Sequence, residues 1–251
     1  MITTLIAASL LVSDQDRTSL VEYRDAKGTV CEAVVATPAN PSKNAPWVII
    51  LHDWDGLNDH EIGVAKKLAE AGYYAFAADI YGKGVRPKTT ADNSAEAAKY
   101  YKDPGLYKQR IEAALKAAAG LSGGDHRRTA AIGYCFGGTG VLTAARSNMN
   151  LKAVVAFHGG LKPLESVSGL YRPRILVCHG SADGFENENL PGFIKEMKAH
   201  ARRWKLAEYS GAKHAFTVKG SDAMKNPNVG YQERADKESW AAMLDWFSTH
   251  L

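Results

Sequence analysis

The sequence has few cysteines, few prolines and no long apolar run. Its 251 residues include 3 Cys and 9 Pro. Cys31, Cys135 and Cys178 lack the number and spacing of a disulfide framework or of a Cys/His metal site. No run of about 18 apolar residues occurs, so the sequence predicts no transmembrane helix. With 45% hydrophobic and 23% charged residues, the composition excludes intrinsic disorder, a coiled coil and a collagen-like fibre.

The sequence also lacks a strong excess of positive or negative charge. The chain carries 31 Lys and Arg against 27 Asp and Glu, a net charge of +4. The basic residues are dispersed, apart from pairs such as Arg127 and Arg128. Nucleic-acid binding requires a clustered basic stripe with base-stacking aromatics. We therefore expect an ordinary solvated surface, no nucleic-acid partner and no membrane partner.

The N-terminal segment, residues 1–18, resembles part of a signal peptide. Residues 1–12 are apolar and uncharged. However, no Lys or Arg precedes them, and the first small-x-small site, at residues 7–9, comes too early for cleavage. The sequence thus slightly favours a cytoplasmic protein over an exported one. We expect one domain over residues 19–251.

Short apolar runs alternate with amphipathic segments along that domain. Continuous apolar runs that are each followed by a helix are typical of a parallel sheet covered on both faces. We predict an α/β fold with a doubly wound, mostly parallel sheet, opened by an antiparallel pair at 20–23 and 30–36. The other predicted strands are 47–51, 73–78, 129–133, 153–157, 174–178 and 205–209. The predicted helices are 59–71, 107–119, 138–146, 190–202 and 232–250. The alanine-rich segment 95–98 also indicates helix, and loops such as 83–93 and 218–231 are expected to shape a substrate pocket.

A G-x-Cys-x-G motif connects one predicted strand to a helix. It comprises Gly133, Cys135 and Gly137 within GYCFGG, the pattern of a nucleophile elbow with Cys in place of Ser. The small residues let strand and helix approach closely. The helix N-terminus next to the sulfur is expected to favour a thiolate. By itself this pattern fits a structural glycine-rich turn almost equally well.

Two further residues support catalysis. Asp183 follows the predicted strand 174–178, and His214 follows the strand 205–209. The order Cys, Asp, His matches the order of nucleophile, acid and histidine in α/β-hydrolases. Carboxyl ends of parallel strands meet at one sheet edge. We therefore predict a catalytic triad of Cys135, Asp183 and His214.

The loop after the strand 47–51, with sequence HDWDGLN, belongs to the same edge. In this fold that loop supplies the second backbone N–H of the oxyanion hole. We predict that the N–H groups of Trp54 and Phe136 form this hole. Asp53 places a carboxylate near the elbow and is expected to position or restrain the thiol.

The stretches LHDWDGLND, AFAADIYGKG, AAIGYCFGG, VVAFHGGL and HAFT, with the final YQERADKESWAAMLDWF, resemble the dienelactone hydrolase family of the α/β-hydrolase superfamily. The resemblance extends from about residue 20 to residue 251 and implies the Cys135, Asp183 and His214 triad. It also implies carboxymethylenebutenolidase-like ester or lactone hydrolysis, without a metal or organic cofactor, by a monomer or small homo-oligomer. The family's acid after the third strand is usually Glu, whereas this chain has Asp53.

The resemblance also suggests how a substrate is held. Lactone-cleaving members grip the substrate carboxylate with two arginines, one after an Asp-x-Tyr strand end and one four residues after the catalytic His. Here Arg86 could serve as the first, and the second position is Val218. We expect Arg86 and Tyr81 to contact a small substrate that can carry a carboxylate.

Two alternatives stay open. A glutamine-amidotransferase type of elbow-Cys enzyme requires a His-x-Glu pair, and this chain has His214, Ala215 and Phe216. A catalytically silent hydrolase-fold binding module is the other alternative, and the complete triad argues against it.

Overall fold

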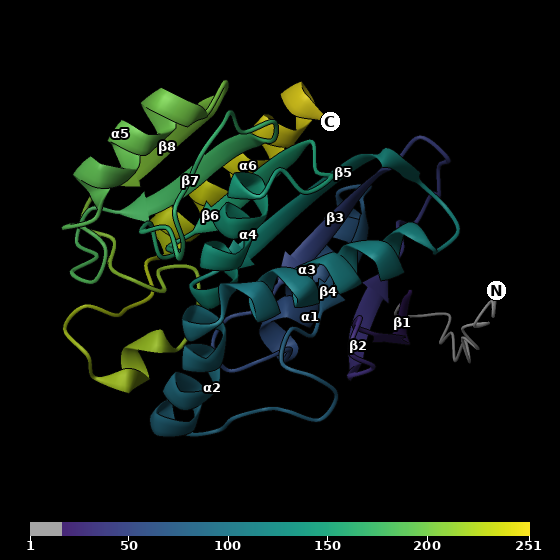
Figure 1. Ribbon diagram of the computed structural model, residues 1–251, viewed down its shortest axis with the longest axis horizontal. Helices are drawn as coiled ribbons and strands as arrows, with labels where there is room; N and C mark the ends of the chain where they lie inside the picture. The colour runs from purple at the N-terminus through teal and green to yellow at the C-terminus, as the bar shows by residue number, and fades with distance from the viewer. Residues whose placement is uncertain (1–16) are drawn as a thin grey trace.

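The computed structural model describes residues 17–251, which form one eight-stranded sheet with flanking helices (Figure 1). The strand order is β1-β2-β4-β3-β5-β6-β7-β8. The strands are β1 (Thr18–Arg24), β2 (Val30–Ala36), β3 (Pro46–Leu51), β4 (Tyr74–Ala78), β5 (Asp125–Tyr134), β6 (Ala153–Phe157), β7 (Arg174–Gly180) and β8 (Trp204–Tyr209).

The sheet is antiparallel at one edge and parallel elsewhere. β2 pairs antiparallel with β1 and with β4, and every pair from β4 to β8 is parallel. All residues of β4 and of β6 are buried, as expected of parallel strands covered on both faces. β1 alternates exposed and buried residues over its second half, as an edge strand should. The predicted doubly wound, mostly parallel sheet is confirmed.

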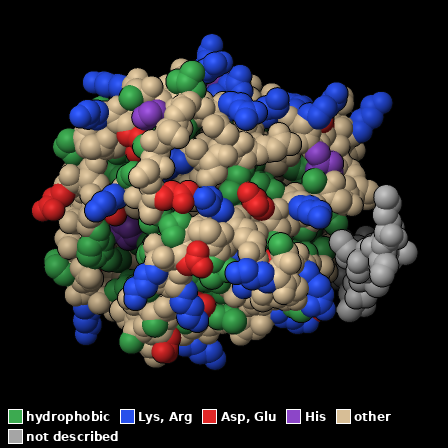
Figure 2. All heavy atoms as spheres, in the orientation of Figure 1, with side chains coloured by type: hydrophobic (Ala, Val, Ile, Leu, Met, Phe, Trp, Pro, Cys, Tyr) green, Lys and Arg blue, Asp and Glu red, His purple; other side chains and the backbone are tan. Residues whose placement is uncertain are grey.

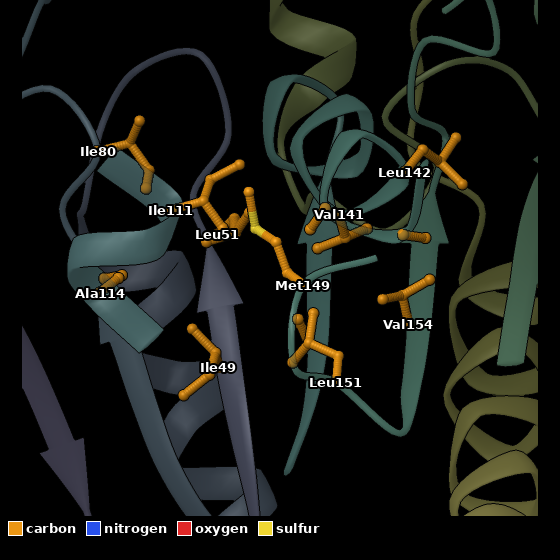
Figure 3. Packing of buried hydrophobic residues seen from close by; sticks show 14 of the residues in the cluster. Ile49, Leu51, Ile80, Ile111, Ala114, Val141, Leu142, Met149, Leu151 and Val154 are labelled. Carbon is orange, nitrogen blue, oxygen red and sulfur yellow. The ribbon is translucent and has the colours of Figure 1, made fainter. Parts of the chain in front are cut away.

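Helices cover the two faces of the sheet and bury separate apolar clusters. On one face lie α2 (Thr90–Lys102), α3 (Pro104–Ala119), α4 (Phe136–Arg146) and α5 (Leu190–His200). On the other lie α1 (Asp59–Glu70) and α6 (Glu233–His250). Figure 3 shows Ile49 and Leu51 of β3 facing Ile111 and Ala114 of α3. The two clusters hold the sheet in place and thereby position the loops that follow the carboxyl ends of its parallel strands.

Most predicted elements are present with small shifts at their ends. The largest difference is α2, which begins at Thr90 within a stretch expected to be a loop up to residue 93. Thr89 caps this helix by accepting a hydrogen bond from the Asp92 N–H. Asp103 then caps α3 through the Leu106 N–H, so α3 begins three residues earlier than predicted.

The surface agrees with an ordinary charge distribution. Figure 2 shows Lys and Arg side chains scattered over the visible face, with acidic side chains among them. Within residues 17–251 no helix is long and apolar enough to cross a membrane. The prediction that residues 1–18 resemble part of a signal peptide falls almost wholly outside the described residues.

Candidate active site

Cys135 lies at a strained turn between β5 and α4. Its backbone has φ +47° and ψ −106°, a region that side chains other than glycine rarely adopt. A Cβ on Gly133 would lie 2.0 Å from the Gly137 carbonyl oxygen, and one on Gly137 would lie 2.1 Å from the Leu51 carbonyl oxygen. The predicted steric requirement for glycine on both sides of the cysteine is therefore met.

His214 and Asp183 form a hydrogen-bonded pair. His214 Nδ1 lies 2.8 Å from Asp183 Oδ2, and the Asp183 side chain is fully buried. The Phe185 N–H donates to the other carboxylate oxygen at 3.0 Å. Burial lowers the pKa of His214, but the hydrogen bond and charge of Asp183 outweigh it, and the net pKa is raised. The pair has the geometry of a base oriented by an acid.

Cys135 and His214 both line one cavity of about 250 Å³ at the carboxyl ends of the strands. Asp53 and Trp54 line it too, so four residues named from the sequence meet there. Asp183 lies behind His214 and completes the set. The structure thus brings together the residues that the sequence placed at separate strand ends. The remaining lining residues are Tyr101, Gly160, Phe185, Glu186, Ala215, Met224, Asn226 and Val229.

The Cys135 thiol differs from the expected thiolate. Its pKa lies well above the usual value because the group is enclosed and because the Asp53 carboxylate repels a thiolate and accepts a hydrogen bond from the thiol. The Phe136 N–H bonds the sulfur and acts in the opposite direction, but more weakly. The helix N-terminus thus acts in the expected direction through the Phe136 N–H, but burial and the neighbouring negative charge outweigh it, so the net pKa is raised.

Asp53 is held by its own loop and by α1. The Trp54 N–H donates to Asp53 Oδ1 at 2.5 Å, and the Asp53 N–H donates to Glu61 Oε1 at 3.1 Å. Glu61 is fully buried, and its second oxygen accepts from the Asn58 N–H, which closes a capping box. Burial, with repulsion from Asp55, raises the pKa of Asp53 to about 6.

The two predicted oxyanion donors differ in availability. Phe136 is the first residue of α4, so its N–H has no acceptor within the helix and lies at the sulfur. The Trp54 N–H is occupied by Asp53. A complete oxyanion hole therefore requires that Asp53 release the Trp54 N–H.

The predicted substrate contacts of Arg86 and Tyr81 are not supported. Arg86 bonds Glu32 at 2.8 Å and lies 3.5 Å from Asp79, and it is absent from the cavity lining. Two carboxylates already use its guanidinium, which is why it does not extend to the cavity. Tyr81 is also absent from the lining, because it is buried and its hydroxyl donates to the Trp54 carbonyl at 3.0 Å. Tyr81 positions the Trp54 peptide instead.

Two histidines support the same edge without lining the cavity. His52 Nε2 accepts from the Ile80 N–H at 3.1 Å, so its proton resides on Nδ1, which donates to the Asp53 carbonyl at 2.6 Å. Burial lowers the pKa of His52 to about 3, so this ring is neutral. His158 bonds Thr217 at 2.8 Å, and its ring packs edge-on against that of His214. Both rings therefore pack next to the site without lining the cavity.

Several lining residues had no specific prediction. Tyr101 comes from the end of α2, which the sequence indicated only through its alanines. Phe185 and Glu186 lie two and three residues after Asp183, so their closeness to the acid in the sequence was the available signal. Met224, Asn226 and Val229 lie in the 218–231 loop, which was expected to shape the cavity. The 83–93 loop, expected to do the same, contributes no lining residue.

Within residues 17–251, no three His, Cys, Asp or Glu side chains are grouped so as to hold a metal ion. The site therefore consists of a thiol, an imidazole, two cavity carboxyls and backbone N–H groups. This set can perform nucleophilic and general acid–base chemistry on an acyl group.

Comparison with known proteins gives concordant matches. The model of the dienelactone hydrolase family matches residues 31–251. A Bradyrhizobium protein named "Probable 2-oxo-3-(5-oxofuran-2-ylidene)propanoate lactonase" is 29% identical over 238 residues, covering 89% of this chain and 92% of its own. The crystal structure of a dienelactone hydrolase-like promiscuous phosphotriesterase from metagenomic libraries has a TM-score of 0.86 at 31% identity, covering 93% of this chain and 99% of that one.

Proposed function

The chain belongs to the dienelactone hydrolase family of ester and lactone hydrolases, and we propose that it cleaves these bonds with Cys135 as nucleophile, His214 as base and Asp183 as the acid that orients it. One observation carries the proposal. The elbow cysteine and the His214–Asp183 pair open onto one cavity, where an acyl carbonyl can reach both.

The reaction proceeds in two halves. His214 accepts the thiol proton while the Cys135 sulfur attacks the carbonyl carbon, and the carbonyl oxygen becomes an oxyanion. When the C–O bond breaks, the leaving oxygen takes the proton from His214, which leaves a thioester on Cys135. A water molecule, deprotonated by His214, then attacks the thioester. The acid is released and the thiol is restored.

Asp53 governs the start of this sequence. In the resting site it accepts the thiol hydrogen bond and occupies the Trp54 N–H. When Asp53 releases both groups, the thiol proton can pass to His214, and the Trp54 N–H joins the Phe136 N–H around the oxyanion. Preorganised donors of this kind contribute roughly 3–4 kcal/mol each to transition-state stabilisation.

The test is a stopped-flow burst assay with p-nitrophenyl butyrate, followed by intact-mass analysis of the quenched enzyme. Wild type should show one equivalent of bound butyryl group on Cys135, and Cys135→Ala and His214→Ala should each lose activity on the order of a thousandfold or more. His250→Ala, at the end of α6 and outside the cavity lining, serves as the control. A folded Cys135→Ala variant with wild-type turnover would refute the assignment and favour another nucleophile. A wild type that hydrolyses no ester or lactone would favour a silent binding module.

A further inference from the structure

The active-site cavity contains negative charge and no resident cation. Asp53 and Glu186 are both among its lining residues, and the lining, which falls wholly within the described part of the chain, includes no Lys or Arg. His214 is the only lining group that can become positive, and it must be neutral to act as a base. Arg86, the cation expected from the sequence, is paired with Glu32 and Asp79.

Glu186 is a fixed and unpaired charge in this wall. Its Oε2 accepts from the Leu161 N–H at 2.8 Å and from the Asn189 side chain at 3.1 Å. The other carboxylate oxygen, Oε1, lies beside Gly160. A Cβ built on Gly160 would be 3.6 Å from this oxygen. Within residues 17–251, no Lys or Arg forms an ion pair with it. The Oε2 contacts hold the side chain in place. Among the described residues, the group that can become cationic and is recorded as interacting with this carboxylate is His214.

The mouth of the same cavity is apolar. Tyr101, Phe185 and Met224 are 39%, 46% and 41% exposed, and all three line the cavity. They come from three separate segments, α2, the loop after β7, and the short helix η1 (Ser221–Met224). Five large hydrophobic side chains are this exposed in the described chain, so most of them gather at one place. Gathered exposed apolar side chains mark a ligand-binding surface.

Building on the proposed function, we propose that this cavity selects uncharged esters and lactones with apolar acyl groups and rejects carboxylate-bearing ones, with Glu186 as the selecting residue. A substrate carboxylate next to Glu186 and Asp53 would meet repulsion and no ion-pair partner. An apolar chain would instead be covered by Tyr101, Phe185 and Met224. The carboxylate-bearing substrate suggested by the family resemblance is the class that this wall disfavours.

The first experiment compares kcat/KM for p-nitrophenyl butyrate, p-nitrophenyl hemisuccinate and a p-nitrophenyl ester whose chain ends in trimethylammonium. Glu186→Gln removes the negative charge but keeps the shape of the side chain. Its amide oxygen can still accept the hydrogen bonds from the Leu161 N–H and the Asn189 side chain. Relative to the neutral ester, the variant should raise kcat/KM for the anionic ester about three- to tenfold and lower it for the cationic ester by a similar factor. The ratio to the neutral ester removes any effect of the variant on His214, whose pKa Glu186 helps to raise. The shifts should shrink with added salt.

Glu188→Gln is the matched control, because Glu188 is exposed, two residues away and absent from the cavity lining. It makes the same change in net charge outside the site. If both variants shift the anionic ester equally, or neither does, selection by Glu186 is refuted while the hydrolase assignment stands.

The second experiment is independent of turnover. It measures the rates at which neutral iodoacetamide and anionic iodoacetate alkylate Cys135, each relative to the unfolded protein. Wild type should favour iodoacetamide, and Glu186→Gln should reduce that preference about three- to tenfold. If no ester is hydrolysed but this preference depends on Glu186, the function proposal fails and the charge selection stands. Equal relative rates in wild type would overturn the charge selection.

Discussion

The Trp54 backbone N–H donates a hydrogen bond to the Asp53 carboxylate at 2.5 Å. The same carboxylate accepts a hydrogen bond from the Cys135 thiol. One side chain therefore contacts both the proposed nucleophile and an expected oxyanion donor. We expect this arrangement to keep the thiol protonated.

Replacing Asp53 by Asn should activate the thiol. The amide cannot repel a thiolate, so the pKa of Cys135 should fall, and a fall of one unit gives about ten times more thiolate below that pKa. The alkylation rate of Cys135 at neutral pH should rise about tenfold, measured with iodoacetamide. Asp59→Asn, an exposed acid at the start of α1, should leave the rate unchanged. An unaltered rate in Asp53→Asn would mean that burial alone sets the thiol pKa.

Alkylation of the folded protein should be confined to Cys135. Cys31 and Cys178 are fully buried, and burial raises the pKa of Cys178 to about 12. Cys135 is the only one of the three with part of its surface exposed. Peptide mapping by mass spectrometry after a single equivalent of reagent provides the measurement. Labelling of Cys31 or Cys178 ahead of Cys135 would contradict the burial in this structure.

The pH dependence should follow His214. Because Asp183 raises the pKa of His214 and the base must be neutral, kcat/KM should rise with pH through a value above 6.5. Asp183→Asn removes that stabilisation of the imidazolium, so the rise should move to lower pH while the maximum rate falls. Asp53 also titrates near this range, since its pKa is raised to about 6. The profile of Asp53→Asn separates the two groups: loss of the rise in that variant would assign it to Asp53.

Gly133→Ala should destabilise the protein because its Cβ would lie 2.0 Å from a backbone oxygen that cannot move without displacing the elbow. We expect a loss of about 3 kcal/mol in the free energy of unfolding, the upper part of the range for overpacking. Gly192→Ala is the matched control. That residue lies in α5 with no atom within 4 Å of its Cβ position, so alanine should stabilise the helix by roughly 0.5–1 kcal/mol. Urea titration of both variants measures the difference, and an unchanged midpoint for Gly133→Ala would contradict the packing at the elbow.

The sequence by itself determined the sheet, most of its helices and the elbow. These features depend on short-range patterns: apolar runs for buried strands, amphipathic spacing for helices, and glycines on both sides of Cys135. The order of Cys135, Asp183 and His214 at successive strand ends was also sufficient to predict that they meet, because carboxyl ends of parallel strands share one edge. The helix α2 was anticipated only in part, because its first turn depends on capping by Thr89 rather than on an apolar face.

Only the tertiary structure decided the charges within the site. Arg86 is kept from the cavity by its ion pair with Glu32, which lies 54 residues earlier in the chain. No local sequence pattern indicates that pairing. The raised pKa of the Cys135 thiol likewise depends on its burial and on Asp53, which lies in the loop after β3. Electrostatic interactions depend on distance and burial in space, so residue type and order can place a group at the site but cannot set its charge state or its partner.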